Sequence, residues 1–83
     1  MTGNCEYCGK WAELDRHHLI GGTGNKQLSE RYNLTMCLCR ECHRKAHEDP
    51  AMYKRLHQIG ERIWISKYGT IEDFIKVFGK NYL

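Results

Sequence analysis

The sequence predicts an α+β domain in which a β-hairpin is crossed by a helix and followed by two additional C-terminal helices. Two Cys-x-x-Cys pairs bracket short apolar segments and a Gly-rich stretch, and from residue 40 onward apolar residues recur at helical spacing. The 83 residues form one domain over residues 1–83, with a core at residues 5–47 and a helical extension at residues 48–83. A domain of this size usually needs a metal or a disulfide to stabilise its core.

The hairpin is expected in the first half of the chain. Residues 11–20 alternate weakly between apolar and polar, and residues 34–38 form a second apolar run. Between them, residues 21–26 are a loop by composition, and residues 27–32 can hold a short helical turn. This connection is long for a hairpin, and long loops in compact domains are often functional.

Three helices are expected after the hairpin. The first runs over residues 40–48. Asp49-Pro50 indicates the start of the second, because Asp caps free amide groups and Pro fits the first helical position. That helix ends near Tyr68, Thr70 caps the last one, and Gly79 ends it. The apolar faces of the last two helices comprise Met52, Leu56, Ile59 and Ile63, then Phe74, Ile75 and Phe78.

The helical extension also carries a glycine and several aromatic residues. Gly60 costs about 1 kcal/mol inside a helix, which indicates that a neighbouring element approaches closely there. We expect the aromatic side chains to pack the helices onto the hairpin or onto each other, and the alternative is a platform on which single strands stack. These aromatic residues are Trp64, Tyr68, Phe74, Phe78 and Tyr82.

The N-terminal residues bear on the compartment. Residues 1–10 are polar and contain cysteine, unlike a signal peptide, and no apolar run approaches the roughly 20 residues that cross a bilayer. We therefore expect a cytoplasmic protein with no membrane partner. Thiols stay reduced in that compartment, so the five cysteines favour metal binding over disulfides.

Four of the cysteines form a candidate zinc site. Cys5 and Cys8 make one Cys-x-x-Cys turn, and Cys39 and Cys42 make a second at the start of the predicted helix. Zinc prefers four tetrahedral ligands, and two such turns around a hairpin are the arrangement of a treble-clef zinc finger. We predict a structural Zn²⁺ on these four sulfurs; the alternative is a set of buried free cysteines. Cys37 is expected to be a packed thiol rather than a ligand or reactive group.

Four of the five histidines fall in two pairs. His43 and His47 are one turn apart on the predicted helix and can chelate one metal. His17 and His18 are neighbours on the predicted strand, so their side chains point to opposite faces. This favours metal binding by one and proton transfer by the other. The alternative is that the histidines are only polar surface or belong to a second zinc site. We expect His57 to be exposed or half-packed and assign it no role.

Residues 5–47 resemble the HNH (ββα-metal) nuclease family. The resemblance lies in Cys-x-x-Cys, Asp-Arg-His-His-Leu, the Gly-rich loop, Asn-Leu and Cys-x-x-Cys-His-x-x-x-His. It implies that His17 and His43 bind a catalytic divalent metal, that His47 is a third ligand, and that His18 is the general base. Asn33 takes the position of the middle Asn, which braces the loop that orients the base, although one extra residue separates it from the second Cys pair. Residues 28–32 and 74–83 resemble small HNH-like proteins encoded by phages and prophages.

The residue types fit hydrolysis of a phosphodiester. A metal on neutral imidazoles keeps open positions, so it can bind a phosphate oxygen while a neutral histidine takes a proton from water. Mg²⁺, Mn²⁺, Ni²⁺ and Zn²⁺ are all candidates for this metal. Arg16, Arg44 and Lys45 flank the predicted site and can hold phosphates, or they belong to a solvated surface. Asp15 can orient a histidine.

The sequence therefore predicts a metal-dependent endonuclease that acts on nucleic acid, with DNA favoured over RNA. The alternative is a non-catalytic treble-clef module that binds nucleic acid or a protein. A third hypothesis is a purely structural adaptor. The net charge of +3 does not decide between them. The narrower resemblance implies a bacterial host cytoplasm and phage or prophage origin, and it leaves open a homodimer or a phage protein partner.

Overall fold

The computed structural model describes residues 1–22 and 24–83, so Thr23, within the predicted loop, lies outside the described residues. A three-stranded antiparallel sheet in the order β1-β2-β3 and four helices make up the described part, which is an α+β architecture. The strands are β1 (Thr2–Asn4), β2 (Trp11–His18) and β3 (Thr35–Cys39). The helices are α1 (Asn25–Arg31), α2 (Arg40–Glu48), α3 (Pro50–Lys67) and α4 (Ile71–Phe78).

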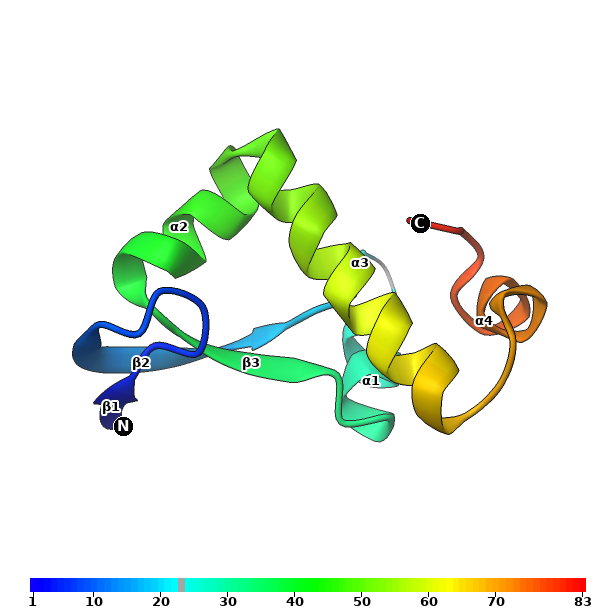
Figure 1. Ribbon diagram of the computed structural model, residues 1–83, viewed down its shortest axis with the longest axis horizontal. Coiled ribbons are helices and arrows are strands. Elements are labelled where there is room, and N and C mark those ends of the chain that lie inside the picture. The colour runs from blue at the N-terminus through cyan, green and yellow to red at the C-terminus, as the bar shows by residue number, and fades with distance from the viewer. Residues whose placement is uncertain (23) are drawn as a thin grey trace.

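The predicted hairpin is confirmed as β2 and β3. They pair antiparallel with His17 opposite Met36 and His18 opposite Thr35. Both helices that follow lie on one side of this hairpin, with α2 packed against both strands and α3 continuing from it at an angle (Figure 1). The hairpin and α2 therefore make the predicted arrangement of two strands crossed by a helix.

Strand β1 was not predicted. It pairs with the first residues of β2, and Glu13 accepts hydrogen bonds from the N-terminal amine of Met1 and the hydroxyl of Thr2. The segment Thr2–Asn4 is too short and too polar to show an apolar alternation. Only its pairing with β2 makes it a strand.

The hairpin connection is more helical than predicted, because α1 begins at Asn25 inside the predicted loop. Ser29 anchors this helix to the end of β2: its buried hydroxyl donates to the carbonyl of Ile20 and accepts from the amide of Ile20. After α1, Asn33 adopts a left-handed conformation at φ 60° and returns the chain to β3. Helix α1 is thus held against the end of β2.

Helix boundaries after the hairpin agree with the local capping chemistry. Asp49 accepts a hydrogen bond from the amide of Ala51 at the start of α3, and Thr70 and Asp73 form a reciprocal capping box at the start of α4. Gly79 ends α4 in the left-handed conformation at φ 84°. The two additional C-terminal helices are therefore confirmed.

The buried face of α3 differs from the predicted one. Met52 and Leu56 are buried as expected, but Ile59 and Ile63 are only partly buried. The remaining buried positions of α3 are His57, Gly60, Glu61 and Trp64. The difference arises at Gly60, where a Cβ would lie 2.9 Å from Ile20 Cδ1 and 3.0 Å from Leu19 Cβ. The close approach predicted for this glycine is confirmed, and it turns the glycine side of α3 toward the hairpin.

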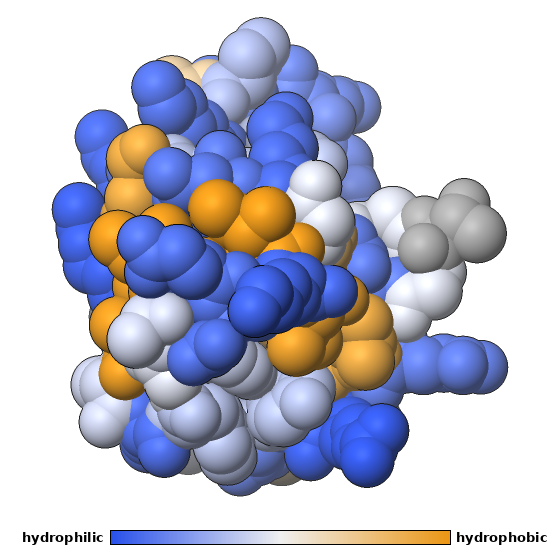
Figure 2. Space-filling model, turned by 90° about the vertical axis from the view of Figure 1, so that its right-hand side faces the viewer, coloured by the Kyte–Doolittle hydropathy of each residue, from blue (hydrophilic) through white to orange (hydrophobic). Residues whose placement is uncertain are grey.

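Aromatic side chains join α3, α4 and α1. Trp64, Phe74 and Phe78 are buried and contact each other's rings, and Tyr32 from the end of α1 packs against Trp64 and Phe78. This confirms that the aromatic residues of the tail pack the helices together. At the α4 end of the molecule, apolar patches alternate with hydrophilic side chains (Figure 2). Among the described residues, no helix has both the length and the apolar character needed to cross a membrane.

Candidate metal centres

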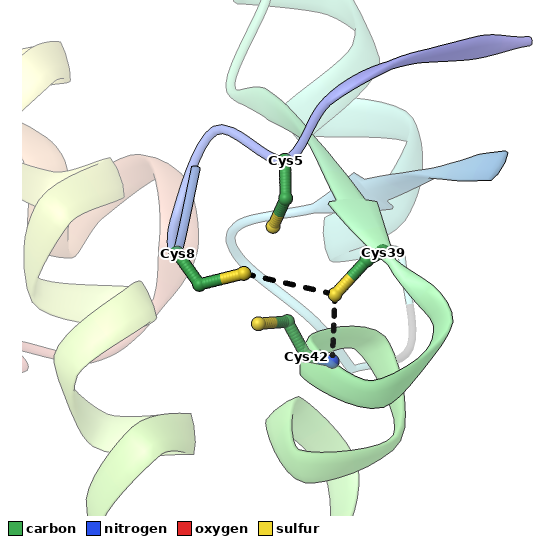
Figure 3. Close-up of side chains that lie close together, drawn as sticks. All are labelled: Cys5, Cys8, Cys39 and Cys42. Carbon is green, nitrogen blue, oxygen red and sulfur yellow. Dashed lines mark hydrogen bonds between the residues drawn. The ribbon is translucent and has the colours of Figure 1, made fainter. Parts of the chain in front are cut away.

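The four predicted zinc ligands converge at one end of the molecule. Cys5 and Cys8 come from the turn after β1, Cys39 ends β3, and Cys42 lies in the first turn of α2, and their sulfurs point toward a common centre (Figure 3). The four Sγ atoms all lie within 4.8 Å of one another. Cys8 Sγ and Cys39 Sγ are 3.9 Å apart, close to the edge of about 3.8 Å of a tetrahedron with metal–sulfur bonds of about 2.3 Å. This cluster can hold a structural metal ion.

Backbone amides favour negative charge at this cluster. Burial acts to raise the pKa of Cys5, but hydrogen bonds from the backbone of Cys8, Cys39 and Tyr7 outweigh it and lower the pKa to about 6. Burial and the neighbouring thiols raise the pKa of Cys42 well above its ordinary value. One cysteine thus forms a thiolate readily. Four thiolates this close together repel one another unless a cation lies between them, and zinc binds deprotonated cysteines.

Cys37 lies outside this cluster, as predicted. It is partly buried on β3, and its amide donates to the carboxylate of Glu6 while its carbonyl accepts from the amide of Glu6. These bonds dock the N-terminal cysteine turn onto β3. They form through backbone atoms of residue 37, so they do not require a cysteine side chain.

A second convergence of metal-ligand side chains lies between β2 and α2. His17, His43 and His47 each offer one ring nitrogen, and the three nitrogens lie within 4.8 Å of one another. The ring centroids are 5.2 Å apart for His17 and His43, 5.5 Å for His17 and His47, and 5.2 Å for His43 and His47. The structure therefore brings together all three histidines proposed as ligands of a second metal.

The donor set suits a divalent cation. Burial, followed by the nearby His43 and His47, lowers the pKa of His17 to about 4, so its ring is neutral near pH 7 and keeps a lone pair. Asp15 Oδ2 lies 3.2 Å from His43 Nδ1. With the His43 proton on Nδ1, the Nε2 atom is left for a ligand bond. The orienting role predicted for Asp15 thus has the required contact.

Strand alternation explains why the neighbouring residues His17 and His18 contact different helices. Asp15 and His17 point toward α2, whereas Arg16 and His18 point to the other face, where both meet Glu30 of α1. His18 Nε2 lies 2.9 Å from Glu30 Oε2, and Arg16 Nη1 lies 2.6 Å from Glu30 Oε1. Since a carboxylate only accepts, a neutral His18 holds its proton on Nε2 and keeps the lone pair of Nδ1. Glu30 is a site residue that the sequence analysis missed.

Asn33 is placed differently from the other predicted site residues. It is exposed at the end of α1, its amide donates to the carbonyl of Glu30, and it does not line the histidine pocket. Within residues 1–22 and 24–83, its side chain forms no hydrogen bond. Its left-handed backbone conformation explains why an Asn suits this position, since Asn tolerates that conformation better than most residues. Its catalytic role stays a prediction.

A pocket of about 900 Å³ contains the three histidines and His18. His57 also lines it and is only 2% exposed, so the expectation of an exposed or half-packed residue is wrong. Its Nδ1 lies 2.8 Å from the carbonyl of Tyr53, and its Nε2 accepts from the amide of Gly21 at 3.1 Å. Burial lowers the pKa of His57, which favours the neutral form that these two bonds require. His57 thus fixes the start of the Gly-rich segment. The other lining residues are Arg16, Gly21, Gly22, Gly24, Lys26, Gln27 and Tyr53.

The cations predicted to bind phosphate are engaged in exposed ion pairs. Arg16 pairs with Glu30, as described above, and Arg44 and Lys45 each pair with a glutamate one turn away on α2. Exposed pairs are worth about 0–1 kcal/mol, so a phosphate can compete for these cations. Only Arg16 of the three lines the histidine pocket. Lys26 lines it as well and, in the described part of the chain, forms no ion pair.

Comparison with known proteins gives one family match. The family model described as "Protein of unknown function (DUF968)" matches residues 1–71. This range contains both groups of candidate metal ligands, His18, Glu30 and all of α3. No curated protein and no solved structure matches the chain.

Proposed function

Because this chain belongs to the DUF968 family, whose description names no activity, we propose from its own residues that it is a metal-dependent HNH-type nuclease domain with a treble-clef zinc site. Its substrate is nucleic acid, with DNA favoured over RNA. The observation that carries the proposal is the convergence of His17, His43 and His47 within 4.8 Å in the pocket that His18 also lines. A structural ion needs no such pocket, whereas hydrolysis needs space for a substrate beside the metal ligands.

Each residue has a role that follows from its contacts. His17, His43 and His47 would hold a divalent cation, which supplies Lewis-acid chemistry toward the phosphate and the departing 3′-oxygen. His18 Nδ1 takes a proton from water as the water oxygen bonds to phosphorus and the bond from phosphorus to the 3′-oxygen breaks. Lys26 and Arg16 bind phosphate oxygens at the pocket wall.

Glu30 is assigned as a positioning residue for His18. Its carboxylate accepts from Nε2 at 2.9 Å, which fixes both the ring orientation and the tautomer that leaves Nδ1 basic. Glu30→Ala removes this acceptor, whereas Glu30→Gln keeps a carbonyl oxygen that can still accept. We expect Glu30→Ala to lower kcat about 10- to 100-fold, within the range of general-base contributions, with KM much less affected and with Glu30→Gln restoring most of the rate. Equal kcat values for Glu30→Ala and wild type would contradict the positioning role of Glu30.

The nuclease proposal is tested by plasmid nicking. Wild type and His18→Ala are compared with Mg²⁺, Mn²⁺, Ni²⁺ and Zn²⁺, and Glu13→Gln, an exposed change on the same strand, serves as the control. We expect nicking by wild type and by the control, and loss of nicking in His18→Ala with unchanged circular dichroism and zinc content. Binding without cleavage under every metal would favour the non-catalytic treble-clef module. Neither binding nor cleavage would favour a structural adaptor.

A further inference from the structure

Three rings in tilted contact, called the ring stack below, lead to the wall of the histidine pocket. The imidazole of His57 lies between two tyrosines, with ring centroids 4.0 Å from Tyr53 and 4.6 Å from Tyr82. The interplanar angles are 33° and 44°. In the described part of the chain, Tyr53 and Tyr82 make no ring contact with each other, so the imidazole is the ring that joins them. The stack therefore ends at Tyr53, whose second face is not covered by His57.

The inner two rings of the stack are held in place by polar contacts. The amide of Tyr82 donates to Glu61 at 2.7 Å, and its carbonyl accepts from Gln58 at 3.0 Å. Both nitrogens of His57 are engaged by backbone groups, as described above. Tyr53 thus packs against a fixed support, which reduces the conformational entropy that binding a planar ligand would cost.

Tyr53 itself is open to ligands. It is 43% exposed and lines the same pocket as the three histidines, His18, Arg16 and Lys26. The pocket volume of about 900 Å³ lies within the range of about 300–1,000 Å³ typical of small-ligand sites. A flat aromatic surface, cations and candidate metal ligands therefore line one space of nucleotide size.

We propose that Tyr53 is a nucleobase-binding residue that stacks on an unpaired base of the substrate strand beside the scissile phosphate. This inference rests on the proposed nuclease function and narrows its substrate to single-stranded or locally unpaired nucleic acid. A base in an intact duplex already has neighbours on both faces, and reaching Tyr53 requires unstacking, which costs a few kcal/mol. Stacking is tolerant of sequence, because every base presents a π-face.

The test measures binding without cleavage, in the absence of added divalent ions. Fluorescence anisotropy follows four short labelled probes: a thymidine DNA strand, a uridine RNA strand, a thymidine strand with abasic positions, and a DNA duplex. Wild type is compared with Tyr53→Leu, Tyr53→Phe and Tyr68→Leu. Tyr68 is a matched control, since it is an exposed tyrosine (49%) at the opposite end of α3 and does not line the pocket. Circular dichroism checks that each variant folds.

We expect Tyr53→Leu to weaken binding of base-bearing single strands about 5- to 100-fold, the range for loss of one stacked base. Tyr53→Phe and Tyr68→Leu should bind as wild type does, and Tyr53→Leu should not change affinity for the abasic strand or the duplex. The DNA and RNA strands show which sugar the site accepts. If wild type binds no strand, or if Tyr53→Leu has no effect or weakens abasic and base-bearing strands equally, the inference is overturned.

Failure of this inference can be told apart from failure of the nuclease proposal. Nicking of plasmid by wild type with no effect of Tyr53→Leu on base-bearing strands would leave the nuclease and remove the base site. Binding that depends on Tyr53, with no cleavage of plasmid or of the thymidine and uridine strands under any metal, would support the base site and remove the hydrolytic role.

Discussion

Loss of one ligand at the cysteine cluster should destabilise the whole domain, and Cys8→Ser is the most direct perturbation. Cys8 is the exposed member of the four, so serine at this position leaves no cavity in the core. Its effect therefore comes from metal binding. The sulfurs of Cys5, Cys39 and Cys42 remain, but a tetrahedral thiolate site loses one of its four bonds.

The expected size of the effect follows from two quantities. Zinc binding to comparable sites is worth about 10–16 kcal/mol, whereas a domain of 83 residues has a total stability of about 4–12 kcal/mol. Even a quarter of the binding free energy, about 3 kcal/mol, would lower Tm by about 12–24 °C in a domain of this size. Removing all the metal should unfold the domain, because the cluster links the N-terminal turn to β3 and α2.

Thermal unfolding followed by far-UV circular dichroism, with metal analysis of each sample, measures the effect. Cys37→Ser is the matched control, since Cys37 lies outside the cluster and its local contacts use backbone atoms. We expect Cys8→Ser to lose zinc and to melt at least about 10 °C below Cys37→Ser. Equal zinc content and equal Tm in the two variants, or a wild type whose melting is unaffected by chelation, would refute the reasoning.

Three further predictions concern stability. Gly60→Ala should destabilise the domain by about 1 kcal/mol in urea unfolding. Overpacking against Leu19 and Ile20 costs about 1–3 kcal/mol, which exceeds the gain in helix propensity of about 1 kcal/mol. A variant more stable than wild type would contradict the close contact at Gly60. The pKa of His17 is about 4 in the folded chain, against 6.5 ordinarily. Between these two pH values the unfolded chain binds a proton at His17 that the folded chain does not bind. The free energy of unfolding should therefore fall by up to about 3 kcal/mol as the pH drops from 6.5 to 4. Without added divalent metal, this pH dependence should be weaker in His17→Leu than in wild type. Acid loss of zinc from the cysteine cluster affects both proteins equally, so it does not change the comparison. Identical pH profiles would exclude a contribution from His17. Thr70→Ala removes the cap of α4 and should cost about 1 kcal/mol by urea titration; an unchanged midpoint would show that the cap contributes nothing.

Much of the fold follows from interactions between residues close in sequence. Asp49-Pro50, Thr70 and Gly79 mark helix ends because a cap satisfies amide or carbonyl groups within a few residues of itself. The four cysteines could be grouped from spacing alone, since the requirement for four soft ligands leaves few other arrangements. Strand alternation likewise separates His17 from His18 without knowledge of the tertiary structure.

The surroundings of the candidate site depend on the tertiary structure. Glu30 reaches His18 only because α1 folds back on the end of β2 through Ser29. His57 enters the pocket wall because close packing at Gly60 turns that side of α3 inward, and Tyr53 follows on the same helix. None of these placements leaves a local pattern in the sequence.

Local patterns in the sequence predict the α+β class and the helix ends, and the spacing of the two Cys-x-x-Cys turns groups the four cysteines. The resemblance to a known family, and not a local pattern, chose His17 over His18 as a partner of His43 and His47. The tertiary structure decided which carboxylate contacts His18, which face of α3 is buried, and which aromatic ring lines the pocket. The physical reason is that these contacts join residues distant in the chain, and their partners are selected by how closely whole helices can approach the hairpin.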